Sequence, residues 1–462
     1  MVSGDGRRRI RTILHVDFNS YFATVEQQAN PRLRGKPIGV TGGDRMPASP
    51  DERASRGGER TVIGAASVEA KKFGVKTGMQ IWEAKKLCPQ ITIVPGDSDK
   101  YLETTKKFLN ILKDYSPYLE VFSIDEVFLE IPTSVIPANA GIQLNNSANS
   151  LLDPRLRGDD ILEIAKSIKK RIKTEIGEWI TCSIGISYNK LLAKLAGSLQ
   201  KPDGLVIIAN QKEAIKVLDK LELDAVCGIG PGIKNRLNKL GIFNFKQLRE
   251  ATLDILIFYF KSYGQFLYDC SRGINHAPIF PFYEKEEVKS IGHRHTTSHD
   301  TNNLEEIKQL LLKLTELVAR RLRAKKLVGR TVHCWFRYSF HLRGEEMQLH
   351  LGGVFHGDGM QVTIPYTCDG LEIFKATWKI FHTIWNGDKI RTVGVSISNL
   401  KSETPQNLSL LPESAVQEKI IQAIDQINNK YGEFTLQRGI LLGTGEMKRK
   451  PNPFLADRRF KL

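Results

Sequence analysis

Three acidic residues interrupt apolar segments in the first third of the chain. Asp17 lies in ILHVDF (residues 13–18), and Asp125 and Glu126 lie in VFSIDEVFLEI (residues 121–131). A buried carboxylate without a partner is costly, and a divalent cation is the obvious partner for such a group. Magnesium prefers oxygen ligands, and two such ions can hold the attacking and leaving oxygens of a phosphoryl transfer. The acids are therefore candidate ligands of two Mg²⁺ ions, unless they cap strand ends or pair with arginines.

Both acidic segments are predicted to be strands. Residues 13–18 read as a short buried strand that leads into a helix over residues 20–29. Neighbouring side chains of a strand point to opposite faces, so Asp125 and Glu126 can face one site only if the strand ends or bends there. We therefore expect a turn at that point. Further strands are predicted at residues 61–66 and 181–187, and helices at 68–73, 81–87 and 161–176, which gives an α+β or α/β layer over residues 11–200.

The remainder of the chain is predicted to be organised differently. Residues 202–280 have a mostly helical pattern, and residues 290–403 combine a long helix (304–325) with strand-like segments, which predicts a separate small α+β domain. A tail with a basic end follows from residue 404. Two polar stretches are predicted to be exposed loops, and the second is rich in Asn, Ser and Pro like an insertion: residues 44–60 and 133–160.

The composition favours a nucleic-acid partner. The chain has 67 Lys and Arg against 51 Asp and Glu, a net charge of +16 and a pI near 9.4. Such a balance suits a protein that neutralises phosphates, although it can also serve solubility. The longest apolar stretch, residues 255–260, is too short to cross a bilayer, and the first residues lack the apolar core of a signal peptide. We expect no membrane partner and a cytoplasmic location.

The cysteines argue against a metal or disulfide framework. None of the six forms a C-x-x-C pair, so a zinc ribbon and a set of disulfides are both disfavoured. We expect reduced core residues. The histidines at positions 15, 293 and 295 also fit no zinc spacing and are interpreted as structural or DNA-facing. The cysteines are Cys88, Cys182, Cys227, Cys270, Cys334 and Cys368.

Seven segments in order along the chain resemble the Y-family translesion DNA polymerases, most closely the DNA polymerase IV branch. The resemblance covers residues 13–441, and seven motifs in one order make chance similarity very improbable. The segments are HVDFNSYFATVE (15–26), VEAKKFGVKTGM (68–79), SIDEVFLEI (123–131), SIGISYNKLLAKLAGSLQKPDG (183–204), GIGPGI (228–233), KSIGHRHT (289–296) and RTVGVSISNL (391–400).

This resemblance implies an α+β multidomain fold of the right-hand polymerase type, and a primer-extending enzyme of low fidelity that acts on damaged templates. Its substrates would be primer-template DNA and deoxynucleoside triphosphates, and the expected state is a monomer. The implied domains are a palm (11–20 and 97–201, with the insertion 133–160), fingers (21–96), a thumb (202–280), a linker (281–289), a little finger (290–403) and a tail (404–462).

The resemblance also assigns roles to residues around the acids. Asp17 and Asp125 would bind both metals, Glu126 would bind the metal that activates the primer 3′-hydroxyl, and the Phe18 carbonyl would add a ligand. Phe22, beside Tyr21, would lie beneath the incoming sugar and exclude a 2′-hydroxyl; the alternative is that both rings belong to the core. Lys194, one helical turn after Lys190, would contact the triphosphate; the alternative is that both lysines are solvated.

The fingers segment departs from the family pattern. Val68 and Lys71 replace the usual Tyr and Arg that hold the triphosphate, so that the charge remains while the bidentate fork is lost. Small residues at positions 65–67 would leave room above the nascent base pair for a bulky or misaligned template base. This combination favours lesion bypass over fidelity.

Two segments further along are candidates for binding DNA and a partner protein. Residues 226–248 read as a helix-hairpin-helix whose glycines let backbone N–H groups approach a phosphate; a plain helix turn is the alternative. Residues 406–411 (QNLSLL) resemble the peptide that docks bacterial polymerases on the sliding clamp; the lead-in to a helix is the alternative. The DNA-binding candidates are Gly228, Gly230, Gly232, Lys234 and Arg294, and the clamp-binding candidates are Gln406, Leu408 and Leu410.

Two other functional classes stay open at this point. A non-catalytic DNA-binding scaffold of the same fold would not need all three acids. A two-metal nuclease with a helix-hairpin-helix would not need a sugar-gating ring or a triphosphate lysine. Primer extension with Mg²⁺ and four deoxynucleotides separates the three possibilities.

Overall fold

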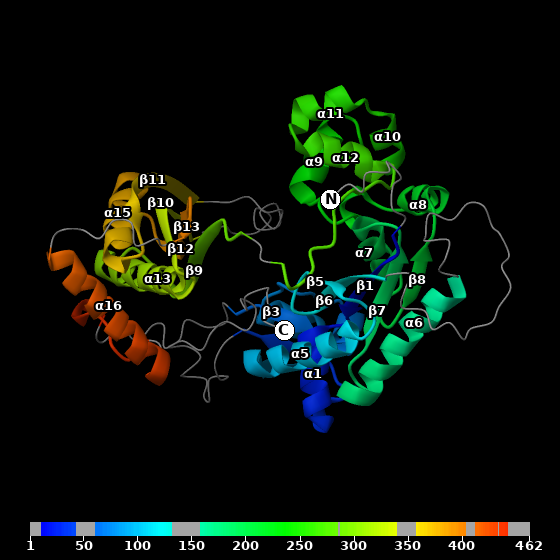
Figure 1. The fold of residues 1–462 in the computed structure, drawn as a ribbon, viewed down its shortest axis with the longest axis horizontal. Helices are drawn as coiled ribbons and strands as arrows, with labels where there is room; N and C mark the ends of the chain where they lie inside the picture. Colours follow the sequence, from blue (N-terminus) through cyan, green and yellow to red (C-terminus); the bar gives the residue numbers. More distant parts are fainter. Residues whose placement is uncertain are drawn as a thin grey trace. The chain divides into compact units, whose positions relative to one another are not determined.

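The computed structural model describes residues 11–42, 61–131, 158–284, 287–339, 357–402, 412–432 and 434–441. The described chain forms two compact units, which meet in sequence at residues 285–286 (Figure 1). The first unit contains the three candidate acids. The second contains the segment that was predicted to be a separate α+β domain.

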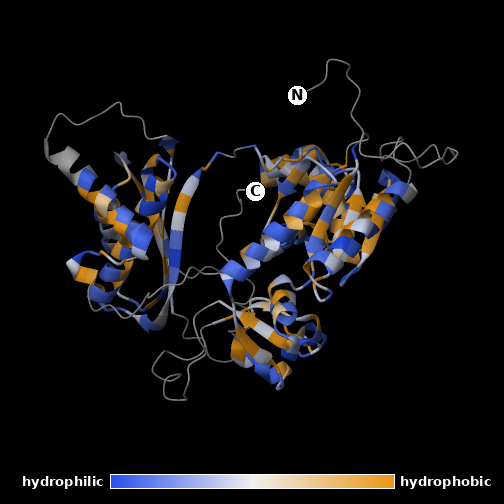
Figure 2. Cartoon of the chain, turned by 60° about the horizontal axis from the view of Figure 1, so that its bottom comes forward, coloured by the Kyte–Doolittle hydropathy of each residue, from blue (hydrophilic) through white to orange (hydrophobic). Residues whose placement is uncertain are grey.

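A five-stranded sheet forms the centre of the first unit, in the order β5-β6-β1-β7-β8. Strand β1 (Ile13–Phe18) lies between β6 (Glu126–Glu130) and β7 (Cys182–Ser187) and is antiparallel to both. All six residues of β1 are buried, so the strand is covered on both faces, and apolar residues dominate the strands of this sheet (Figure 2). The edge strands are β5 (Tyr118–Val121) and β8 (Leu205–Ile208).

Helices cover the two faces of this sheet differently. Leu14 and Val16 point into a core shared with α1 (Tyr21–Ala29), α5 (Ser98–Lys113) and α6 (Gly158–Arg171). Helix α7 (Lys190–Leu199) packs on the other face, beside β7, β1 and β8 (Figure 1). Because side chains alternate along a strand, His15 and Asp17 face α7. Helix α6 continues as one π-helical turn, η3 (Ile172–Ile176).

Two further groups of elements complete the first unit. A three-stranded sheet, β3-β2-β4, carries two short helices that the sequence predicted at nearly the same bounds. A cluster of short helices forms the other group. The first group is η1 (Pro31–Leu33), β2 (Ile38–Thr41), β3 (Ile63–Ala66), α3 (Val68–Lys72), α4 (Ile81–Leu87) and β4 (Thr92–Pro95); the second is α8 (Gln211–Leu218), η4 (Leu223–Ala225), α9 (Pro231–Lys239), α10 (Phe245–Glu250), α11 (Leu253–Phe260) and α12 (Tyr263–Ser271).

The second unit is a sheet with two helices packed on one face. Its antiparallel strands follow the order β11-β10-β12-β9, and α13 and α15 share a core with them. The long helix predicted over residues 304–325 is confirmed at nearly the same bounds, and the strand-like segments of this domain belong to an antiparallel sheet. The elements are β9 (Ser290–Thr301), α13 (Leu304–Ala324), β10 (Leu327–Tyr338), β11 (Gly357–Thr367), α15 (Gly370–Ile384), β12 (Ile390–Ser398) and β13 (Lys401–Ser402).

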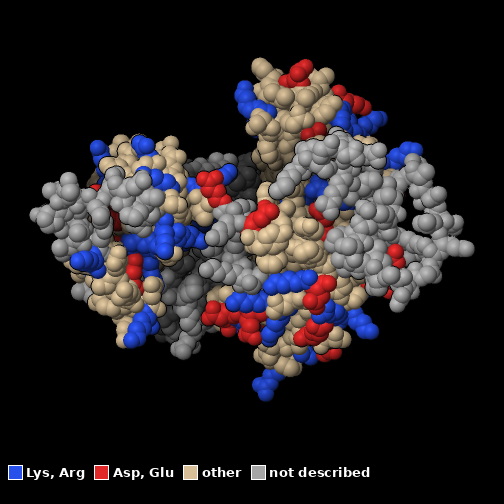
Figure 3. Space-filling view, viewed as in Figure 1, with Lys and Arg blue, Asp and Glu red and all other residues tan. Residues whose placement is uncertain are grey.

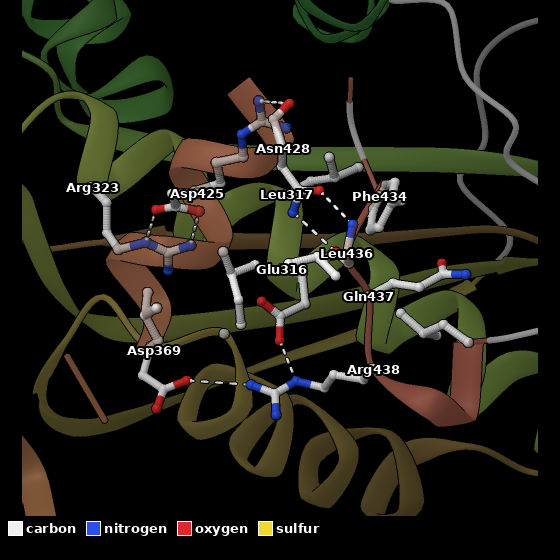
Figure 4. A pocket seen from close by; sticks show the side chains of 15 residues that line it. Glu316, Leu317, Arg323, Asp369, Asp425, Asn428, Phe434, Leu436, Gln437 and Arg438 are labelled. Atoms are coloured by element: carbon white, nitrogen blue, oxygen red, sulfur yellow. Dashed lines mark hydrogen bonds and ion pairs between the residues drawn. The ribbon is translucent and has the colours of Figure 1, made fainter. Parts of the chain in front are cut away.

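The segment predicted to be a tail is part of the second unit. Residues 412–431 form helix α16 (Pro412–Tyr431), and the turn η6 (Gly439–Leu441) places Leu441 in the core of this unit with 1% of its surface exposed. Arg323 of α13 donates to both carboxylate oxygens of Asp425 at 2.6 and 2.8 Å (Figure 4). A cavity of about 270 Å³ lies among these elements. The predicted tail is therefore wrong for residues 412–441, because its apolar residues at helical spacing were overlooked.

Four other predictions need correction. The strand predicted over residues 121–131 is two strands, since β5 ends at Val121 and β6 begins at Glu126. The helical pattern of residues 202–280 missed β8, which extends the first sheet. Helix α6 begins at Gly158, inside the predicted insertion, whose residues 133–157 lie outside the described part. Not every cysteine is in a core, because Cys227 is exposed and Cys368 is half-buried. Among the described residues, no helix is long and apolar enough to cross a membrane.

Candidate active site

The pairing of β1 with its two neighbours brings the acids together. Asp17 stands opposite Glu126 on β6, so both side chains project from the face that carries α7. Asp125 precedes β6 in the turn from β5, and its carbonyl accepts the Phe18 N–H at 3.0 Å. The turn expected at these two acids is thus present, immediately before Glu126.

A cavity of about 560 Å³ opens beside these acids. It joins the end of β1 to the start of α1 and to the small sheet with α3, so the structure places most of the predicted nucleotide residues around one space. Lys194 does not line this cavity, whereas Lys201 does. The lining residues are Asp17, Phe18, Asn19, Ser20, Tyr21, Phe22, Gly64, Ala65, Ala66, Val68, Lys71, Lys72, Thr77, Asp125, Glu126, Lys201 and Pro202.

Two lysines contact the acids from one side. Lys201 donates to Asp17 Oδ2 at 2.6 Å, and Lys194 of α7 contacts Glu126 Oε2. Asp125 accepts from the Ser123 hydroxyl at 2.5 Å. Lys201 was not predicted as a site residue, although it lies in the segment 183–204 that carries the family resemblance, and that segment is the signal that could have identified it.

Burial and charge shift the pKa values of Asp125 and Glu126 in opposite directions. Burial raises the pKa of Asp125 to about 6, and the neighbouring Glu126 and Asp17 carboxylates act in the same direction. Burial also acts to raise the pKa of Glu126, but the hydrogen bond from His15 and the charge of Lys194 outweigh it and lower this pKa to about 2. Burial together with Lys201 lowers the pKa of Lys71. Such opposed shifts within one cavity are typical of functional sites.

His15 is a member of this cluster that the sequence analysis treated as structural or DNA-facing. It is 1% exposed, its Nε2 lies 3.4 Å from Glu126 Oε2, and its ring lies against Phe128 with centroids 4.6 Å apart. Burial lowers the pKa of His15, which favours the neutral ring. His15, Asp17 and Glu126 each offer a potential metal-binding atom within 4.8 Å of the others. Its position two residues before Asp17, on the same strand face, is a signal that could have identified it.

The two aromatic residues after the first acid differ in position. Tyr21 is 2% exposed, and its hydroxyl donates to the Tyr101 carbonyl at 2.8 Å, as in a core residue. Phe22 is 9% exposed and stacks on Tyr101 with ring centroids 4.4 Å apart. Both rings belong to the core and also line the cavity, so the two interpretations of Phe22 are compatible.

Two glycines set the distance between α7 and the sheet. A Cβ on Gly185 of β7 would lie 2.1 Å from the Ala193 carbonyl oxygen, and one on Gly197 would lie 3.2 Å from His15 Nδ1. The backbone of α7 can therefore approach β7 and β1 closely only with glycine at position 185. This close approach lets Lys194 reach Glu126.

The predicted DNA-binding residues lie outside this cavity. Gly228 has φ +106° and Gly230 precedes α9, the arrangement that a phosphate-binding turn requires. Lys234 is engaged by Asp224 at 2.9 Å and by Glu222 at 3.2 Å. Arg294 lies on β9, opposite Gly394. Figure 3 shows basic and acidic side chains interspersed on the visible face of the first unit, so charge alone does not locate a DNA path there.

Comparisons with known proteins identify the family. Residues 16–198 match the model of the impB/mucB/samB family, and residues 288–410 match the model of its C-terminal domain. The DNA polymerase IV of Moorella thermoacetica is 35% identical over 94% of this chain and 97% of its own length. That of Pelotomaculum thermopropionicum is 33% identical over 93% and 95%. DNA polymerase IV 1 of Bacillus subtilis is 29% identical over 97% of both chains.

A solved structure agrees in fold. A chimera of Y-family DNA polymerases matches with a TM-score of 0.65 and 22% sequence identity, over 85% of this chain and 99% of the chimera. The mixed helix and sheet architecture expected from the sequence is confirmed. With the matches to the family models and to curated relatives along nearly its whole length, the chain belongs to the Y family of DNA polymerases, in its DNA polymerase IV branch.

Proposed function

We propose that the cavity at the end of β1 is the polymerase centre of a DNA-directed DNA polymerase that extends primers past damaged template bases. The observation that carries the proposal is the convergence of Asp17, Asp125 and Glu126 beside a cavity of about 560 Å³. A nuclease or a scaffold would not need the ring of Phe22 in this position.

The donor set fits a divalent cation. Three carboxylates line one partly buried cavity, and burial together with the neighbouring carboxylates raises the pKa of Asp125. Hard oxygen donors of this kind suit magnesium, and we assign two Mg²⁺ ions to Asp17, Asp125, Glu126 and the Phe18 carbonyl. When bound, the ions would lower the pKa of the primer 3′-hydroxyl and offset charge on the phosphates.

The chain's own residues would orient the nucleotide. Phe22 supports the sugar and excludes a 2′-hydroxyl, while Lys71 and Lys201 offer positive charge from two sides of the cavity. Lys194 was predicted to contact the triphosphate. Its ammonium group contacts Glu126 Oε2 instead of lining the cavity, so the triphosphate contact stays a prediction. The small Ala65 and Ala66 line the same space and leave room for a distorted base pair.

The remaining assignments extend to partners. Backbone N–H groups near Gly228, Gly230 and Gly232 hold a DNA phosphate, and Arg294 contributes a second contact from the other unit. Gln406, Leu408 and Leu410 lie outside the described residues, and their binding to a sliding clamp stays a prediction, as do the monomeric state and the cytoplasmic location. Replacing the three clamp residues by alanine should abolish clamp stimulation and leave unassisted extension unchanged.

A primer-extension assay tests the proposal. The protein is incubated with Mg²⁺, four deoxynucleotides and two templates that differ by one abasic site. We expect extension on both templates, and none when EDTA replaces the metal. Primer shortening would indicate a nuclease, and binding without extension would indicate a scaffold; either result would overturn the proposal.

A further inference from the structure

His15 occupies a position that an apolar residue would fill at lower cost. It lies on β1 between Phe128 of β6 and Gly185 of β7, with 1% of its surface exposed. Its Nδ1 is buried and has no hydrogen-bond partner among the described residues. An unsatisfied buried polar atom is destabilising, and each one in a native protein calls for an explanation.

The only polar side chain that the ring meets at hydrogen-bond distance among the described residues is Glu126, at 3.4 Å from Nε2. A neutral imidazole has one N–H, and with Nδ1 unpartnered, that hydrogen belongs on Nε2. Nε2–H therefore donates to Glu126 Oε2. Phe128 fixes the plane of the ring from one side, and Gly197 leaves it just enough space on the other, because a Cβ there would lie 3.2 Å from Nδ1.

The contacts to Glu126 involve only one of its two carboxylate oxygens. Both His15 and Lys194 contact the same carboxylate oxygen, Oε2. Oε1 is thus the oxygen that the carboxylate can offer to a cation without giving up either contact. Lys194 sits on a long side chain that is 22% exposed, whereas the imidazole is enclosed and cannot move away.

We propose that His15 is a positioning residue for the polymerase reaction: its Nε2–H holds Oε2 of Glu126 so that Oε1 faces the metal site. This inference rests on the proposed function, in which Glu126 binds metal. His15 itself is not assigned as a ligand, because magnesium prefers oxygen donors. Hydrogen-bond partners that orient metal-binding side chains typically contribute 10- to 100-fold to metal affinity or activity.

Single-nucleotide extension, measured over a range of Mg²⁺ concentrations, tests this role. His15→Leu removes the donor and keeps an apolar volume, while His15→Gln keeps an N–H near the place of Nε2. We expect His15→Leu to raise the Mg²⁺ concentration for half-maximal rate about tenfold or more without lowering Tm, because the orphaned Nδ1 is removed as well. His15→Gln should recover much of the loss.

Matched variants separate this role from simple loss of packing. Ile13→Ala, on the same face of β1, should lower Tm and leave the Mg²⁺ dependence unchanged. If His15→Leu does not fold, His15→Val carries the test, since a smaller apolar side chain fits the space. Wild-type Mg²⁺ dependence in every folded variant that lacks the donor would overturn the inference. Glu126→Gln distinguishes the two levels: if this variant is fully active, the metal assignment of Glu126 itself is wrong.

Discussion

Two clusters of partly buried charged side chains differ in whether their acids form ion pairs with arginine or lysine. In the second unit, Arg323 binds both oxygens of Asp425, and Arg438 donates to Glu316 at 2.6 Å (Figure 4). Burial acts to lower the pKa of Arg323, but Asp425 outweighs it, so the charged form is favoured. In the cavity at the end of β1, by contrast, burial and neighbouring acids disfavour the charged form of Asp125.

The difference shows how a structural charge cluster can be told from a functional one. In the cluster around Asp425, both Asp425 and Glu316 accept from an arginine at 2.6 Å, and the Arg323–Asp425 pair joins α16 to α13. In the cluster around Asp17, lysines form ion pairs with Asp17 and Glu126. Among the described residues, Asp125 has no ion pair and His15 Nδ1 has no hydrogen-bond partner. An acid that has no cationic partner and a shifted pKa, in a cavity, is typical of a functional site that binds a ligand.

Removing an acid from the cluster around Asp17 should have the largest effect. Asp17→Ala or Asp125→Ala should reduce kcat/KM for extension at least about 10³-fold, because a metal ligand that offsets phosphate charge is lost. DNA binding, measured by fluorescence anisotropy, should persist. Near-wild-type extension by both variants would remove the contrast between the two clusters.

Removing an acid from the cluster around Asp425 should affect stability instead. Asp425→Ala leaves the half-buried Arg323 without its carboxylate partner and should destabilise the second unit by roughly 1–3 kcal/mol. Extension at 25 °C should change little. The double variant Arg323→Met with Asp425→Leu should recover most of the lost stability, because an apolar pair can replace a buried ion pair. Thermal unfolding of the three proteins measures this, and a loss of catalysis with unchanged Tm would contradict a structural role.

The proposed role of Phe22 as a sugar gate bears on the same comparison, because Phe22 packs in the core and also lines the cavity. Phe22→Ala should raise ribonucleotide use about ten- to a hundredfold, since a clash of roughly 1–3 kcal/mol with the 2′-hydroxyl disappears. Deoxynucleotide use should change much less. Because Phe22 packs in the core, Tm should fall by the equivalent of roughly 3–5 kcal/mol in either case. If Phe22 serves only the core, kcat/KM should fall equally for both substrates. The ratio of kcat/KM for ribonucleotides to kcat/KM for deoxynucleotides, measured with Tm in one preparation, decides between the two roles.

The smallest expected effect is the pH dependence of stability that follows from the raised pKa of Asp125. Its pKa is raised from 3.8 to about 6 in the folded state, so its contribution to stability is present below the unfolded value and is lost as the pH rises through 6. Glu126, with a pKa lowered to about 2, contributes above 4.5 and loses that contribution only as the pH falls towards 2. Without metal, Asp125→Asn should therefore be more stable than wild type at neutral pH, by on the order of 2 kcal/mol. At about pH 4 the two should be equal, and Tm with EDTA measures both; equal stability at both pH values would refute the shift.

The sequence predicted the strands and helices of the fold well wherever the hydrophobic pattern was local. The strand that carries Asp17, helix α13 and the turn before Glu126 follow from apolar periodicity and from the geometry of adjacent acids. Helix α16 was missed because it was taken as part of a basic tail. Lys201 was overlooked although it lies in the segment 183–204, because its contact with Asp17 joins residues 184 positions apart and does not follow from local periodicity.

The close packing of α7 on β7 has a consequence for how the site can change in evolution. The reach of Lys194 to Glu126 depends on the missing side chains at positions 185 and 197, that is, on the spacing of two backbones. A mutation that adds a methyl group at Gly185 would push the helix, its lysine and the wall of the His15 pocket outward together. We therefore expect the acids, the lysine and the glycines to be retained or lost together in evolution. Related sequences that keep the acids but lack Gly185 are expected to have lost catalytic activity.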